Sequence, residues 1–183
     1  KVAASVGGLL VVDEAYAEFS SETSAATLIA QYPNVIVIRT MSKAFAFAGA
    51  RLGYLIADPA VIDALQLVRL PYHLSAITQA VAEVALSFSD ELLAGVDTLI
   101  AQREIVQAGL GKIGLTITPS AANFLLFGGF NQPADQLWRK LLDRGILIRD
   151  VGLLGQLRVT IGTAAENQAF LSALTEVLAE GDK

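Results

Sequence analysis

The sequence predicts an α/β protein. Three short apolar runs, at 7–12, 34–39 and 52–57, have the length and aliphatic composition of strands, and stretches with helical spacing of apolar residues follow them. Hydrophobic residues make up 54% of the 183 residues and charged residues 17%, which is enough apolar material for a substantial core. This length corresponds to one domain or slightly more.

The amino-terminal half is expected to consist of strands that end in polar turns. Pro33 ends a short helix, because its ring disfavours a helical residue before it. Asp58 can cap the helix that follows the third strand, with Pro59 in the first turn, and Ser75 can cap the next helix. The expected elements after the first strand are a helix at 25–31, strands at 34–39 and 52–57, and helices at 60–70 and 76–87.

The carboxyl-terminal half begins with a long helical pattern from about residue 90 to 112. Strands and helices alternate after it. Thr163 and Glu166 have the spacing of a capping box and open the last helix. The expected elements are strands at 115–118, 123–127, 146–149 and 157–161, and helices at 134–144 and 163–179.

Composition argues against several classes of partner. The net charge is −5 and the basic residues are scattered, so nucleic acid is not an expected partner. The apolar runs are too short or too interrupted to span a membrane. The absence of cysteine leaves no disulfide or thiolate metal site and fits a reducing cytoplasm. His73 is the only histidine, which favours a hydrogen-bonded loop residue over a metal ligand.

Polar side chains end two of the apolar runs. Ser42 and Lys43 follow the second run, and open α/β sheets place their ligands at the carboxyl ends of strands. A lysine among Ala, Phe and Gly is expected to be partly desolvated, which would lower its pKa and make it a nucleophile. The alternative is a surface lysine whose stem lies along apolar neighbours. Asp13 and Tyr16 end the first run, so a carboxylate and a phenol can converge with this amine.

Two stretches carry a resemblance to a known family. Val-Asp-Glu-Ala-Tyr-Ala-Glu-Phe at 12–19 and Thr-Met-Ser-Lys-Ala-Phe-Ala-Phe-Ala-Gly at 40–49, with Arg51 eight residues after Lys43, resemble the fold-type-I enzymes that use pyridoxal 5'-phosphate (PLP). Within that group they are similar to the histidinol-phosphate aminotransferase family. The resemblance continues through 122–126, 145–150 and 157–162.

The resemblance implies a partial form of the PLP-dependent transferase fold type I. It implies a partial three-layer α/β/α large domain that binds PLP over residues 1–88, and a small α+β carboxyl-terminal domain over residues 89–183. The chain would correspond to the carboxyl-terminal half of a longer enzyme.

The resemblance also implies roles for the residues of the two strand ends. Lys43 would bind PLP as a Schiff base and carry a proton, Asp13 would pair with the pyridine nitrogen, and Tyr16 would hydrogen-bond the ring oxygen. Ser42 and Arg51 would bind the cofactor phosphate. The structural alternatives are a turn-capping Asp13, a half-buried Tyr16, a turn serine at 42 and a surface ion pair at 51. Glu14 and Glu18 are interpreted as solvated or supporting charges.

Three residues of the second half match substrate-binding positions of the family. Arg149 and Arg158 would hold a phosphate or carboxyl group of the substrate, and two arginines suit a doubly charged phosphate better than a carboxylate. Either could instead be a surface arginine. Asn123 matches a position near the pocket.

The function implied by the resemblance is transamination between histidinol phosphate and 2-oxoglutarate in histidine biosynthesis, by a ping-pong mechanism and in a cytoplasmic homodimer. The partners would be small amino-acid and keto-acid substrates. Two alternatives stay open. One is an aromatic amino-acid aminotransferase of the same group. The other is an inactive folded fragment that lacks half of the cofactor site and leaves several apolar faces without cover.

Overall fold

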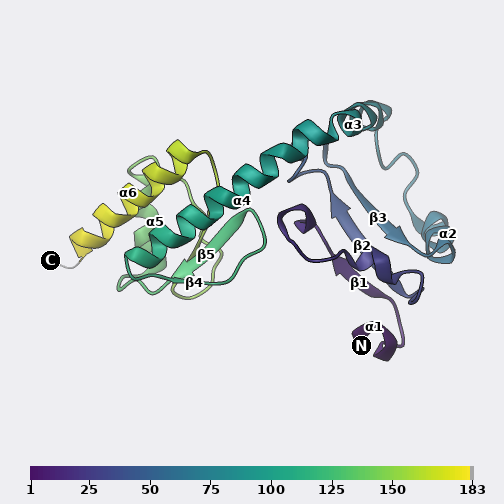
Figure 1. Ribbon diagram of the computed structural model, residues 1–183, viewed down its shortest axis with the longest axis horizontal. Coiled ribbons are helices and arrows are strands. Elements are labelled where there is room, and N and C mark those ends of the chain that lie inside the picture. Colours follow the sequence, from purple (N-terminus) through teal and green to yellow (C-terminus); the bar gives the residue numbers. More distant parts are fainter. Residues whose placement is uncertain (182–183) are drawn as a thin grey trace. The chain divides into compact units, whose positions relative to one another are not determined.

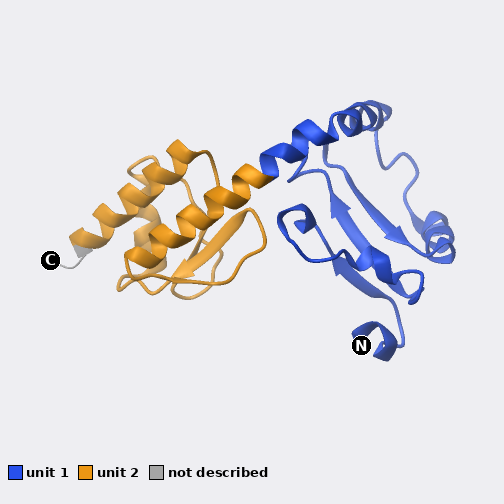
Figure 2. Cartoon of the chain, in the orientation of Figure 1, with its two compact units in different colours: residues 1–96 blue, residues 97–183 orange. Residues whose placement is uncertain are grey.

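The structure, a computed structural model, describes residues 1–181 (Figure 1). It divides into two compact units, residues 1–96 and 97–183 (Figure 2). The division falls inside the long helix α4 (Ser89–Lys112), whereas the sequence analysis places it at residue 88. Each unit has its own three-stranded sheet.

The sheet of unit 1 joins one parallel and one antiparallel pair. Strands β1 (Leu10–Asp13) and β2 (Val35–Thr40) are parallel, and β2 is antiparallel to β3 (Gly53–Ala57), so the strand order is β1-β2-β3. The remaining elements of this unit are α1 (Val2–Ser5), the 3-10 helices η1 (Ala17–Phe19), η2 (Ala25–Leu28) and η3 (Ala48–Ala50), α2 (Pro59–Val68) and α3 (Ala76–Ser87).

Local capping signals give the helix starts of unit 1. The Asp58 carboxylate accepts the amide hydrogen of Ala60 at 2.9 Å, and the Ser75 hydroxyl accepts that of Thr78 at 3.0 Å, as expected. The helix expected at 25–31 is wrong in type and length, because only the short 3-10 helix η2 forms. The Ser24 hydroxyl accepts the amide of Ala26, which opens this turn.

The apolar runs of unit 1 are covered on part of their surface. Val35 and Val37 of β2 are fully buried against Ala3, with Leu10 and Val12 of β1 packed beside them. Other large apolar residues of these strands are more than a third exposed; they are Val11, Ile38, Tyr54, Leu55 and Ile56. These exposed faces agree with the expectation that apolar surface of this half lacks cover within the chain.

Unit 2 has a closed core on its antiparallel sheet. The strands β4 (Thr116–Ile117), β5 (Phe124–Gly128) and β6 (Gln156–Thr160) pair in the order β4-β5-β6. The helices are the second part of α4, α5 (Ala134–Leu142) and α6 (Ala164–Gly181). Buried side chains from all three helices and from β5 and β6 form one cluster, which includes Val106, Leu137, Leu157 and Leu174.

Two sequence expectations for unit 2 have different outcomes. The capping box is confirmed, because the Glu166 carboxylate accepts the Thr163 amide at 2.7 Å and the Thr163 hydroxyl accepts the Glu166 amide at 3.3 Å. The strand expected at 146–149 is wrong. Only Arg149 pairs there, in an isolated bridge to Arg158, because Gly145 and Gly152 with positive φ turn the chain on both sides.

None of the helices described in residues 1–181 is long and apolar enough to cross a membrane.

Candidate functional site

The sheet of unit 1 brings five of the expected site residues to one edge. Because β1 and β2 are parallel, Asp13 at the end of β1 and Lys43 after the end of β2 lie at the same edge. The antiparallel strand β3 starts at this edge, with Gly53 opposite Thr40, so Arg51 also lies there. Tyr16 and Ser42 belong to the turns that follow β1 and β2. We call these five residues the strand-end cluster.

The turn that carries Lys43 is held by hydrogen bonds to the neighbouring strand. The Met41 amide donates to Leu52 O at 3.2 Å, and the Phe47 amide donates to Met41 O at 3.1 Å. The Thr40 hydroxyl accepts from the Ser42 amide at 3.1 Å and donates to Leu52 O at 3.2 Å. Met41 itself is buried. The turn therefore has a fixed backbone, although it contains no regular strand or long helix.

Lys43 extends from this turn with its amine above the ring of Tyr16. The distance from Nζ to the ring centroid is 5.6 Å, within the range of a cation–π contact. Among the described residues the ammonium group has no hydrogen-bond or ion-pair partner. The side chain is exposed, so the expected desolvation of Lys43 is not found in this chain. The neighbouring Ala44, whose side chain is buried, occupies the apolar side of the turn.

Asp13 and Tyr16 lie on the loop after β1. The Asp13 carboxylate is exposed, and its Oδ1 accepts the Ala15 amide at 3.0 Å, which is the turn-capping contact foreseen as an alternative role. This contact leaves the carboxylate accessible. Tyr16 is half-buried, and its ring packs against that of Phe19 with the centroids 6.5 Å apart.

Arg51 occupies a strained backbone position at the end of η3, two residues before β3. Its φ of 55° lies in the left-handed region, which costs a residue with a side chain about 1 to 2 kcal/mol. Its Nη1 donates to Ala48 O at 3.1 Å, and among the described residues it forms no ion pair, unlike the surface alternative. Ala46, in the same turn, also has a positive φ, of 53°. Non-glycine strain of this kind is found most often at functional sites.

A hydrogen-bond network centred on Glu14 joins the loop after β1 to strand β2. The Glu14 carboxylate accepts hydrogen bonds from the Ser24 hydroxyl at 2.8 Å, from the Ala25 amide at 2.6 Å, and from Nε and Nη2 of Arg39 at 3.1 and 2.7 Å. Arg39 Nη1 also contacts Glu18 at 3.2 Å. Of the two interpretations of Glu14 and Glu18, solvated or supporting charges, the structure favours the second, because both are half-buried and paired with Arg39.

The network shifts two pKa values. Burial alone would raise the pKa of Glu14, but the hydrogen bonds from Ser24, Ala25 and Arg39 outweigh it and hold the pKa below the usual 4.5. Burial would lower the pKa of Arg39, and its contact with Glu14 outweighs that effect and raises it. The pair is therefore ionised at neutral pH. Sequence reasoning missed it because the partners are 25 residues apart and no local pattern links them.

Two of the three expected substrate residues, Arg149 and Arg158, line a groove of about 590 Å³ in unit 2, whereas Asn123 does not line it. Arg149 and Arg158 face each other across a backbone bridge, with both amide-to-carbonyl distances at 2.9 Å. The lining also includes Arg139, a third cation that the sequence analysis did not single out, and the acidic residues Asp135 and Asp150. Three arginines and two aspartates leave a net positive charge in the groove, which favours an anionic ligand.

Arg158 is held by its aromatic neighbour. Its guanidinium carbon lies 4.8 Å from the ring centroid of Phe124 on the adjacent strand. Its Nε is buried and has no hydrogen-bond partner among residues 1–181. A buried donor without a partner is costly and is expected to be satisfied by a ligand or water. Asn123 precedes β5, where its carbonyl accepts the Ile161 amide at 2.9 Å.

The other polar candidates carry no site. His73 is exposed in the loop between α2 and α3, with Nδ1 3.0 Å from Nη1 of Arg69, which confirms a hydrogen-bonded loop residue. Within residues 1–181, no group of three or more His, Asp or Glu side chains is arranged to hold a metal ion.

Comparison with known proteins gives the family. The model of a family described as "Aminotransferase class I and II" matches residues 1–174. The chain belongs to this family. Membership confirms the resemblance to aminotransferases that the sequence carries.

Curated aminotransferases narrow the relationship. The chain is 61% identical over 172 residues to a histidinol-phosphate aminotransferase of Mycolicibacterium smegmatis, which is 93% of this chain and 45% of that protein. It is 62% identical over 165 residues to the enzyme of that name from Nocardia farcinica, at 90% and 43% coverage. The chain thus spans less than half the length of these relatives.

Solved aminotransferase structures confirm the fold. The chain aligns with the histidinol-phosphate aminotransferase from Sinorhizobium meliloti, in complex with pyridoxal-5'-phosphate, with a TM-score of 0.82 and 32% identity over 94% of this chain and 49% of the other. A putative histidinol-phosphate aminotransferase from Erwinia carotovora gives a TM-score of 0.86 and 27% identity, at 94% and 51% coverage. The fold is a partial fold type I, as the sequence predicted.

Proposed function

We propose that the chain contributes to a PLP-dependent aminotransferase that transfers an amino group between histidinol phosphate and 2-oxoglutarate in histidine biosynthesis. The observation that carries the proposal is the strand-end cluster, in which the Lys43 amine, the Asp13 carboxylate and the Tyr16 phenol meet at one sheet edge. The named relatives at about 60% identity support the substrate. Because the chain spans under half of their length, the proposal concerns an enzyme of their full length.

The strand-end cluster offers donors and acceptors that would suit part of PLP. Lys43 offers an amine without a hydrogen-bond or ion-pair partner among the described residues, and it would hold the cofactor covalently. Asp13 would hold a proton on the pyridine nitrogen, and Tyr16 would donate to the ring oxygen. Ser42 and Arg51 would bind the phosphate. When bound, PLP supplies an electron-withdrawing ring that stabilises negative charge on the substrate α-carbon.

Lys43 would also move the proton of the reaction. In that role its amine would remove the proton from the substrate α-carbon and return it. General acid–base catalysis of this kind contributes about 10² to 10⁴-fold to a rate.

The groove of unit 2 would hold the phosphate group of the substrate. Arg149 and Arg158 supply planar, permanently charged donors that suit a phosphate group. The unpartnered Nε of Arg158 supports a role in binding an anion. Asn123 is proposed to contact the substrate near the start of β5.

The proposed function also implies a domain organisation and an oligomeric state. Unit 1 would belong to the large PLP-binding domain and unit 2 to the small domain, with the two domains joined through α4. We propose that the enzyme is a homodimer in the cytoplasm and acts on small amino-acid and keto-acid substrates.

A substrate panel on an enzyme of full length tests the proposal. Glutamate is the amino donor, and imidazole acetol phosphate is compared with phenylpyruvate as the acceptor. Charge-assisted hydrogen bonds to a phosphate are worth about 1.5 to 3 kcal/mol, so we expect imidazole acetol phosphate to be preferred by about 10- to 100-fold in kcat/KM. A preference for phenylpyruvate would show an aromatic amino-acid aminotransferase instead.

Two variants and the 183-residue chain alone extend this substrate panel. Arg158→Gln removes the charge in the groove and should reduce the preference for the phosphate-bearing acceptor, whereas Lys112→Gln removes an exposed charge at the end of α4 and should leave it unchanged. The 183-residue chain, assayed alone, distinguishes an active part from an inactive folded fragment.

A further inference from the structure

Glu14 connects two segments that carry the strand-end cluster. It directly follows Asp13, and Tyr16 lies two residues further along the same loop. Its partner Arg39 lies on β2, four residues before Lys43. The bidentate contact between the Glu14 carboxylate and Arg39, at 2.7 and 3.1 Å, therefore ties the loop of Tyr16 to the strand that leads to Lys43.

The same carboxylate closes the loop on itself. Glu14 accepts from the Ser24 hydroxyl and the Ala25 amide, so it joins the first and last residues of the loop between β1 and η2. Four hydrogen bonds to one half-buried carboxylate restrict it to a single position. Because the Glu14 carboxylate is held in this way, the adjoining residues of the loop are held with it.

Other contacts keep the loop folded when the carboxylate is changed. The Glu14 amide donates to Ile38 O at 2.9 Å and extends the strand pairing by one residue. Phe19 is almost fully buried and anchors the middle of the loop. A change at the Glu14 side chain should thus alter the placement of Tyr16 more than the fold of unit 1.

From these contacts we propose that Glu14 is a positioning residue, which sets the distance between the Tyr16 phenol and the Lys43 amine through its bond to Arg39. The proposal rests on the proposed function, because it gives this distance a role in holding and using PLP. Among the described residues, the hydrogen-bond partners of the Glu14 carboxylate are Ser24, Ala25 and Arg39, so it would act on Lys43 and Tyr16 through the loop and β2.

The contact between Arg39 and Glu14 depends on the geometry of the two groups as well as on their charges. Arg39 presents a planar fork to Glu14 and a third nitrogen to Glu18 at 3.2 Å. A lysine at position 39 would keep the charge but could not make the two parallel bonds. A glutamine at position 14 would keep the shape but remove the charge that the fork requires.

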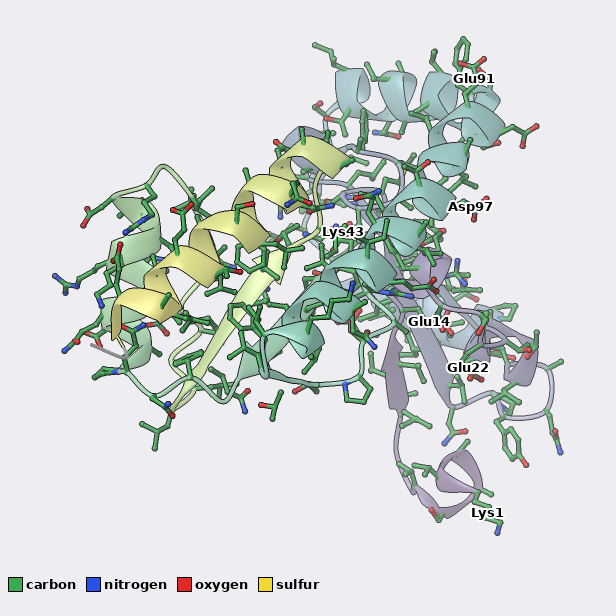
Figure 3. The ribbon with its side chains drawn as sticks, turned by 60° about the vertical axis from the view of Figure 1, so that its left-hand side comes forward. Lys1, Glu14, Glu22, Lys43, Glu91 and Asp97 are labelled. Atoms are coloured by element: carbon green, nitrogen blue, oxygen red, sulfur yellow. The ribbon has the colours of Figure 1, made fainter. Side chains whose placement is uncertain are left out.

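The experiment compares Glu14→Gln with Glu22→Gln in the 183-residue chain. Glu22 lies on the same loop, is exposed, and accepts no hydrogen bond through its side chain among the described residues, so it is a matched change of charge (Figure 3). The first readout is NMR: the cross-peak between the Lys43 ε-methylene and the Tyr16 ring, and the change that the ring current causes in the ε-methylene chemical shift. The second readout is the rate at which PLP labels Lys43 when the adduct is trapped with borohydride.

We expect Glu14→Gln to weaken the cross-peak and to move the chemical shift of the Lys43 ε-methylene toward its random-coil value. PLP labelling of Lys43 should slow by about threefold or more, because a small misplacement of a reacting group reduces a rate strongly. Glu22→Gln should match the wild type. Arg39→Lys should behave like Glu14→Gln, and it decides the question if Glu14→Gln fails to fold.

The outcomes separate this proposal from the function itself. A Glu14→Gln chain with the wild-type cross-peak and labelling rate overturns the positioning role and leaves the function standing. A wild-type chain of full length that is not labelled at Lys43 overturns the proposed function, whereas the NMR comparison still decides whether Glu14 sets the distance.

Discussion

Leu157→Ala tests whether the core of unit 2 supports the substrate groove. Leu157 is fully buried in β6, directly beside Arg158. The substitution removes three buried carbon atoms from a cluster to which α4, α5 and α6 all contribute, so the cavity cannot collapse completely. The cost is about 3 kcal/mol, within the range of 2 to 5 kcal/mol measured for such changes.

Urea unfolding monitored by tryptophan fluorescence measures this cost. Trp138 is the only tryptophan, and its indole nitrogen donates to Ile148 O at 2.9 Å, so its emission reports on unit 2 alone. A unit of this size has a urea slope of about 1.5 kcal/mol per molar, so the midpoint should fall by about 2 M. Leu154→Ala, at a fully exposed leucine three residues earlier, is the control and should shift the midpoint by less than about 0.3 M.

The reasoning is refuted if Leu157→Ala leaves the midpoint within about 0.3 M of the wild type, or if the two variants shift it equally. Either result would mean that the β6 face is not part of a tight core. The proposed placement of Arg158 would then lose its structural support.

Three further predictions concern charge and backbone strain. The pKa of Glu14 is lowered in the folded chain, so the ionised carboxylate stabilises the fold above pH 4.5, and this stabilisation is lost as the pH falls through the folded pKa. The urea midpoint of unit 1 should therefore drop less between pH 7 and pH 3 in Glu14→Gln than in the wild type. The Thr163 amide and hydroxyl hold the pKa of Glu166 below 4.5, so an NMR titration of Glu166 should shift back toward 4.5 in Thr163→Ala. Arg51→Gly should raise stability in urea by about 1 kcal/mol, because glycine tolerates the positive φ, and should weaken PLP labelling.

The edge that carries the strand-end cluster could be predicted from the sequence. Apolar runs that end on Asp13 and before Lys43 indicated strand ends, and parallel strands bring such ends together. The helix caps at Asp58 and Ser75 were also predictable, because a cap depends on a side chain and an amide only two or three residues apart.

Short elements could not be predicted in the same way. The segment 146–149 has strand-like residues, but a strand needs a continuous partner, and only Arg149 finds one. The segment 25–31 has helix-forming residues, but the amides of Ile29 and Gln31 donate to the carbonyls of Ala26 and Leu28, three residues earlier, which is the 3-10 pattern. Both segments therefore have residues that suit a regular element that does not form.

The environment of Lys43 also depends on more than its neighbours. Alanine and phenylalanine beside it suggested burial, yet the side chain is exposed, because burial requires another segment to cover the turn. Similarly, the pair of Glu14 and Arg39 bridges two strands and has no local signature. Such pairs become visible only when the strand register is known.

The most direct test of the central claim is to incubate the chain with PLP, reduce it with borohydride and map the adduct by mass spectrometry. Lys43→Arg is the control, and the other lysines, at 1, 112, 140 and 183, serve as internal references. The account predicts a phosphopyridoxyl group on Lys43 in preference to the other lysines, in this chain or in the enzyme of full length. Equal labelling of all lysines in the full-length enzyme would contradict it.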